Sequence, residues 1–79
     1  MQLEIDVMSF EEEAIDKVFH NMPAVRNDII LLLSGQDFHN LATVEGKEAL
    51  RLAVLESIQQ SARTDLVIEN VFFTTFIMQ

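Results

Sequence analysis

The sequence predicts a small α/β (α+β) domain in which two strands at the ends of the chain enclose three helices. The first eight residues alternate apolar and acidic side chains, which is typical of a half-buried strand. The middle of the chain carries apolar residues at helical spacing, and the last nine residues, VFFTTFIMQ, have strand composition. Two strands alone are rarely stable, so we expect one sheet with the helices packed on one face. A further strand from outside these residues would fit the same plan.

Length, composition and charge limit the possible functions. Seventy-nine residues correspond to a single domain over 1–79, and the absence of cysteine leaves neither disulfides nor thiolate metal sites. The net charge of −8 argues against binding nucleic acid or anionic lipid headgroups, which both require concentrated positive charge. The longest apolar run is Ile29 to Leu33, whereas a membrane helix needs about 20 residues. No signal peptide is visible, and the abrupt start suggests that an anchor or signal has been removed.

The first helix is expected to begin near Ser9. In the stretch S-F-E-E, Ser9 would be the N-cap and Glu12, three residues later, would complete a capping box. Glu11 and Glu13 join Glu12 in the first turn, where the helix dipole favours anions. The predicted buried stripe comprises Ala14, Ile15, Val18, Phe19 and Met22.

Two more helices follow. Pro23 is suited to open the second helix, which would run to about Leu33 and stop at a left-handed Gly35. Residues 37–42 allow only a helical turn. Thr43 can cap the third helix, which would end near Ala62. The second helix would bury Val25, Ile29, Leu32 and Leu33; in the third, Leu50, Val54 and Ile58 would face the sheet, with Leu52 and Leu55 off that stripe.

The final strand is apolar on both alternating faces. With a strict period of two, Val71, Phe73 and Ile77 point one way, and the other face holds Phe72, Phe76 and Met78. We therefore expect this strand to be covered on both sides, by the helices or by a partner. The Phe cluster suits a plain core as well as an interface.

Three blocks of the sequence resemble a known family. They are MPAVRNDIILLLS from Met22, LATVEGKEALR from Leu41, and the terminal VFFTTFIMQ. Together they resemble the periplasmic domain of the flagellar basal-body-associated FliL family and cover about two thirds of the chain. Phe72 stands where that family often has Tyr, and Thr75 where it often has an acidic residue. The family's membrane-spanning helix is missing here.

The resemblance implies a non-enzymatic accessory protein of the bacterial flagellar motor, similar in fold to stomatin-type SPFH domains. Such a domain would lie on the periplasmic side of the inner membrane and form a homo-oligomeric ring. The ring would bind stator subunits, hold the engaged stator and support torque and swimming motility, with a basal-body ring protein as a further partner. Residues considered for the oligomer or partner interface are Arg26, Leu52, Leu55, Phe72 and Phe76. Arg26 is equally suited to an ion pair with Asp28 or another carboxylate.

Catalytic, metal and cofactor sites are not predicted. His20 and His39 lack the spacing of a helical zinc site, and adjacent glutamates diverge around a helix. Ser34 and Ser57 have no paired histidine in their sequence context, and E-G-K at residues 45–47 lacks the phosphate-loop pattern. Two rival classes stay open: a small acidic, monomeric adaptor that binds a basic protein partner, and a small enzyme.

Overall fold

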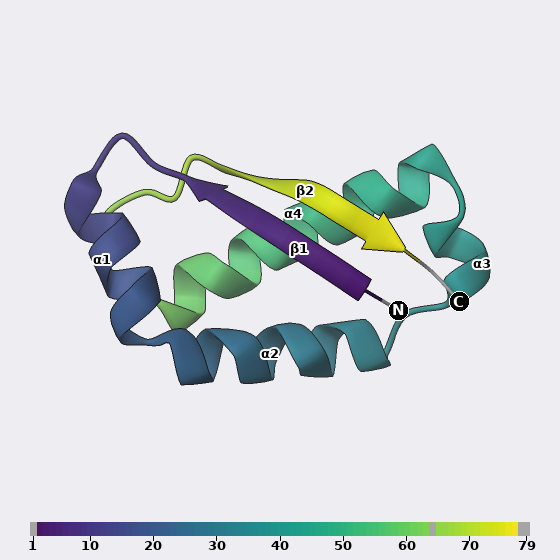
Figure 1. The fold of residues 1–79 in the computed structure, drawn as a ribbon, viewed down its shortest axis with the longest axis horizontal. Helices are drawn as coiled ribbons and strands as arrows, with labels where there is room; N and C mark the ends of the chain where they lie inside the picture. The colour runs from purple at the N-terminus through teal and green to yellow at the C-terminus, as the bar shows by residue number, and fades with distance from the viewer. Residues whose placement is uncertain (1, 64, 78–79) are drawn as a thin grey trace.

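The computed structural model describes residues 2–63 and 65–77 (Figure 1). Its elements follow the predicted order. They are β1 (Gln2–Met8), α1 (Glu12–His20), α2 (Met22–Ser34), α3 (Phe38–Leu41), α4 (Val44–Ser61) and β2 (Asn70–Ile77). The mixed α/β class is confirmed, and α3 is the helical turn expected within 37–42.

The two described strands pair antiparallel, and the helices pack against one face of this sheet. Helix α4 runs behind the strands in Figure 1, and α2 lies beside it along the molecule. The predicted sheet-facing stripe of α4 is confirmed, because Leu50, Val54 and Ile58 are each at most 2 % exposed. The remaining buried apolar residues are Ala14, Val18, Val25, Leu41, Ala62, Ile68 and Val71.

A β-bulge in β2 decides which way its side chains point. Glu4 lies opposite Thr75 and Ile5 opposite Phe73, so Thr74 is left without a partner in the register. One extra residue reverses the alternation, because successive side chains in a strand point to opposite faces. Phe76 therefore joins Phe73 on the inner face, with the ring centroids 5.5 Å apart.

The helices of the chain cover only one face of β2, so cover of the other face by a partner stays a prediction. Phe72 and Ile77 are 45 % and 44 % exposed and lie on the outer face, whereas strict alternation had placed Ile77 with Phe73. The inner face holds Val71, Phe73 and Phe76 above the helices. Met78, the other residue assigned to a face, lies outside the described residues.

The start of α1 also differs from the prediction. Its N-cap is Glu11, which makes no side-chain capping bond, so the capping box from Ser9 to Glu12 is not formed. Instead, the Ser9 hydroxyl donates to the Val67 carbonyl at 2.6 Å and accepts from the Glu11 N–H at 3.1 Å. Ser9 thereby ties the β1–α1 turn to the segment before β2. Phe19, predicted in the buried stripe of α1, is 67 % exposed.

The other helix ends mostly follow the sequence. Pro23 lies in the first turn of α2, and the Thr43 side chain accepts from the Gly46 N–H at 2.9 Å, both as predicted. Gly35 does end α2, but with φ −89° and not in the left-handed conformation. Arg63 adopts a left-handed φ of 53° just after α4. The Gln59 side-chain oxygen accepts a hydrogen bond from the Ile68 N–H at 2.6 Å and so fixes the segment between α4 and β2.

Candidate interaction surfaces

The five residues predicted for an interface do not come together on one surface. Phe72 is exposed on the outer face of the sheet, and Phe76 is half-buried on the inner face. On α4, Leu52 is 51 % exposed, while Leu55 packs against the core. Arg26 lies exposed on α2. The structure therefore separates the predicted set: Phe72, Leu52 and Arg26 are exposed on three different elements, and the other two residues pack against the core.

Arg26 borders an apolar groove between β1 and α2. This groove has a volume of about 500 Å³ and a second groove between β1 and α1 has about 370 Å³. Both include Ile5 and Met22, so they follow β1 on the side away from its pairing with β2. Arg26 makes no ion pair within the described residues, and Asp28 instead accepts a hydrogen bond from the Ser61 hydroxyl.

Helix α4 is fastened to β2 by two cationic side chains. Arg51 forms an ion pair with Glu48 and donates a second bond to Asn70 of β2. The hydrogen bond from Arg51 lowers the pKa of the Glu48 carboxyl, and the same bond raises the pKa of the guanidinium. The Lys47 ammonium lies 5.5 Å from the centre of the Phe76 ring, a cation–π distance. Arg51 and Lys47 thus make contacts between α4 and β2 within the chain.

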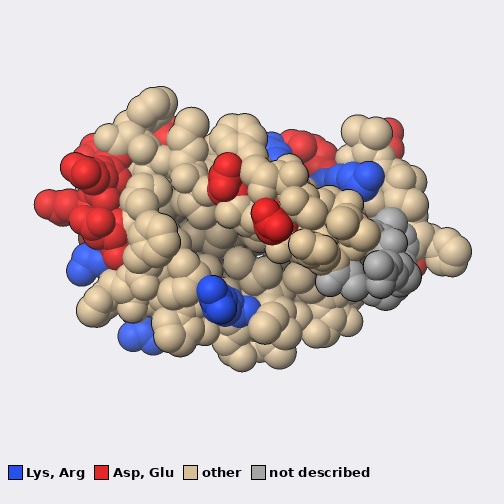
Figure 2. All heavy atoms as spheres, in the orientation of Figure 1, with Lys and Arg blue, Asp and Glu red and all other residues tan. Residues whose placement is uncertain are grey.

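Acidic side chains gather at the end of the molecule where α1 begins (Figure 2). Glu11, Glu12 and Glu13 are all exposed there, and none has an ion-pair partner among residues 2–63 and 65–77. The sequence revealed this acidic run but not the apolar side chains beside it. Phe10 is 81 % exposed and Val67 is 55 % exposed. In the sequence, the one indication of this apolar surface was Phe10, an aromatic residue between a turn serine and three glutamates.

Metal-binding clusters and membrane-spanning helices are absent from the described part of the chain. No group of three or more His, Cys, Asp or Glu residues is arranged there to hold a metal ion. None of its helices combines the length and the apolar character required to cross a membrane.

Comparison with known proteins identifies the family. Residues 1–79 match the family model described as "Flagellar basal body-associated protein FliL". The chain belongs to the FliL family. This membership confirms the resemblance carried by the three sequence blocks.

A curated relative agrees with this assignment. The chain is 31 % identical over 68 residues to the flagellar protein FliL of Aquifex aeolicus strain VF5. The alignment covers 86 % of this chain but 42 % of that FliL protein, so the chain spans less than half of the relative's length. No solved structure matched the chain. FliL membership associates the chain with the flagellar basal body, while the SPFH likeness stays a prediction.

Proposed function

We propose that the chain is the periplasmic part of a non-enzymatic accessory protein of the flagellar motor. The observation that carries this proposal is the FliL family match over residues 1–79. The exposed apolar side chains support a role that works through protein contacts, because such patches often mark interaction sites. The site of action would be the periplasmic side of the inner membrane at the basal body.

The proposed mechanism is a ring that holds the stator in its engaged state. A ring that binds only the engaged form shifts the stator population toward that form by its differential affinity. Subunit contacts need exposed apolar area, and α2 and α4 supply it with side chains that are more than half exposed: Ile30, Leu31 and Leu52. The stator subunits and a basal-body ring protein would be the partners.

Swimming speed in viscous medium tests the flagellar role. An in-frame deletion of the gene should slow swimming under load, and the complete gene should restore it. Unchanged speed at every load would refute the proposal.

The ring is tested by two variants in the complemented strain and in purified protein. Leu52→Ser should weaken oligomers in light scattering and fail to restore swimming. Val44→Ser is the matched control, because Val44 is 81 % exposed on the same helix. If both variants assemble and swim like the wild type, α4 is not the subunit contact.

A second candidate is a monomeric acidic adaptor for a basic protein partner. The acidic end of the molecule favours it, since its glutamates have no ion-pair partner in the part of the chain that the structure describes. A monomer in light scattering, together with normal swimming after gene deletion, would favour the adaptor over the ring.

A further inference from the structure

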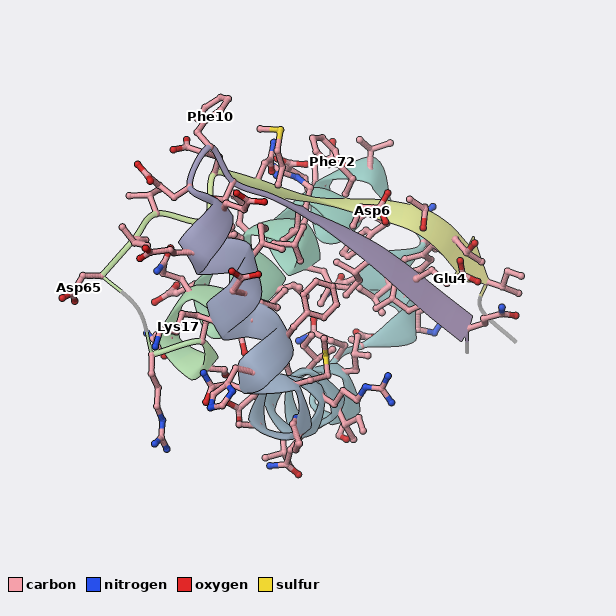
Figure 3. The ribbon with its side chains drawn as sticks, turned by 60° about the vertical axis from the view of Figure 1, so that its left-hand side comes forward. Glu4, Asp6, Phe10, Lys17, Asp65 and Phe72 are labelled. Atoms are coloured by element: carbon pink, nitrogen blue, oxygen red, sulfur yellow. The ribbon has the colours of Figure 1, made fainter. Side chains whose placement is uncertain are left out.

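Four exposed apolar side chains lie around the junction of β1, α1 and the segment before β2. We call them the Phe10 surface: Met8, Phe10, Val67 and Phe72 are 38 %, 81 %, 55 % and 45 % exposed. Phe10 and Phe72 lie on the same side of the sheet in Figure 3. Exposed apolar side chains that are grouped on a surface often mark interaction sites.

Backbone and hydroxyl bonds hold the parts of the Phe10 surface together. The Ser9 hydroxyl donates to the Val67 carbonyl, which brings the Phe10 turn beside Val67. The Glu69 N–H donates to the Met8 carbonyl at 2.8 Å. Phe72 lies opposite Asp6 in the register, so Met8 is its diagonal neighbour on the outer face. The surface is therefore set by the fold and not by a loose loop.

Carboxylates lie on the outer face of β1 and in the segments that adjoin the Phe10 surface in the sequence. Glu4 and Asp6 of β1 lie on the outer face of the sheet, the face that carries Phe72 of β2 (Figure 3). The remaining acidic neighbours in the sequence are Glu11, Glu12, Glu13, Asp65 and Glu69, all exposed. None of these seven side chains has an ion-pair partner within the described residues. An apolar centre with an acidic rim is the complement of a basic segment that carries an apolar anchor.

We infer that the Phe10 surface binds a cationic polypeptide segment with an aromatic or aliphatic anchor residue. A second copy of the chain is a poor occupant of this surface, because its five Lys and Arg residues are dispersed along the sequence and offer no basic segment to the acidic rim. Arg51 is already paired with Glu48, and Lys47 lies over Phe76. Like charges across an interface disfavour association, which also excludes anionic lipid and nucleic acid.

The apolar and acidic groups have separate roles in this inference. The anchor of the partner contacts the exposed rings of Phe10 and Phe72 and supplies most of the affinity, as buried aromatic residues do in interfaces. The acidic rim orients the basic segment and raises its association rate, an effect that weakens with salt. The inference requires neither ring formation nor a flagellar role.

Tryptophan fluorescence gives a direct test, because the chain contains neither Trp nor Tyr. The probe is a short synthetic peptide with one central Trp flanked by lysines, titrated with the purified protein. We expect a blue shift of the Trp emission and an affinity that falls as salt is added. A second peptide, with serines in place of the lysines, should bind much more weakly.

Matched variants locate the binding. Phe10→Ser should weaken the Lys–Trp peptide about tenfold, as loss of an aromatic anchor does. Val44→Ser should leave binding unchanged, since Val44 is equally exposed, at 81 %, but is the first residue of α4. Helix α4 begins at the end of the molecule opposite the β1–α1 turn (Figure 1). Glu12→Gln should weaken binding and reduce its salt dependence, whereas Glu45→Gln, which also removes a first-turn carboxylate, should not.

Two results would overturn the inference: no binding of the Lys–Trp peptide, or equal losses in the Val44 and Glu45 controls. Equal losses would mean a general attraction between cations and an acidic protein. The swimming assay answers a different question, so failure of the flagellar proposal leaves this binding result intact, and the converse also holds.

Discussion

Gly46 supports the sharpest test of the packing, because its replacement should destabilise the domain despite a better helix propensity. Gly46 lies in the first turn of α4, where the chain passes directly over the turn that follows α3. A Cβ atom at Gly46 would lie 1.7 Å from the carbonyl oxygen of Asn40 and 2.9 Å from Thr43 Oγ1. Ordinary contacts between heavy atoms need about 3.5 Å, so the turn would have to move.

The expected cost follows from what that movement breaks. The obstacle is backbone, so no side-chain rotation can relieve it. Opening the turn strains the bonds from the Thr43 hydroxyl to the Asn40 carbonyl at 2.8 Å and from the Gly46 N–H to Thr43 at 2.9 Å. Each such bond is worth about 0.5–1.5 kcal/mol, and overpacking adds about 1–3 kcal/mol. Replacing Gly by Ala returns at most about 1 kcal/mol, so we expect Gly46→Ala to lose about 1–5 kcal/mol.

Urea and thermal unfolding of Gly46→Ala measure this loss, with Gly35→Ala as the control. Gly35 has φ −89°, and its nearest obstacle to a Cβ is 3.8 Å away, so Gly35→Ala should be neutral or stabilising. A loss of 2 kcal/mol lowers the Tm of a domain of this size by roughly 8–16 °C. If Gly46→Ala is as stable as Gly35→Ala, the first turn of α4 does not lie against the Asn40 carbonyl, and the packing argument is refuted.

Three further outcomes are expected. Phe76→Asp should unfold the domain by placing a charge against the core, at a cost of upward of about 3 kcal/mol in unfolding free energy. Ile77→Asp on the outer face should destabilise the domain only slightly. Equal thermal midpoints for the two variants would contradict the bulge. Thr43→Ala should cost about 1 kcal/mol in urea unfolding through loss of the α4 cap, and an unchanged midpoint would exclude the cap. In an NMR titration, Arg51→Ala should raise the pKa of the Glu48 carboxyl. Because that pKa is lowered in the folded state, its contribution to stability is present at neutral pH and is lost as the pH falls through it.

The sequence predicted most of the fold wherever a local rule decided the outcome. The cap at Thr43, Pro23 at the start of α2 and the buried stripe of α4 all depend on residues within one or two helical turns, and all three are confirmed. The Ser9 cap was wrong because a distant partner, the Val67 carbonyl, takes the hydroxyl. A local pattern cannot reveal a hydrogen bond between residues 58 positions apart.

The same distinction explains why the interaction surface was only half visible in the sequence. The acidic run is contiguous, so it could be read directly, whereas Met8 and Phe72 become neighbours only when β1 and β2 pair. The bulge at Thr74 adds a second non-local effect, because it places Phe76 in the core while Phe72 stays on the outer face with Asp6. Without the bulge, Ile77 would point inward with Phe73, and Phe76 would join Phe72 outside. A single unpaired residue therefore decides which aromatic ring completes the core, and the Phe72 ring is left where a partner can reach it.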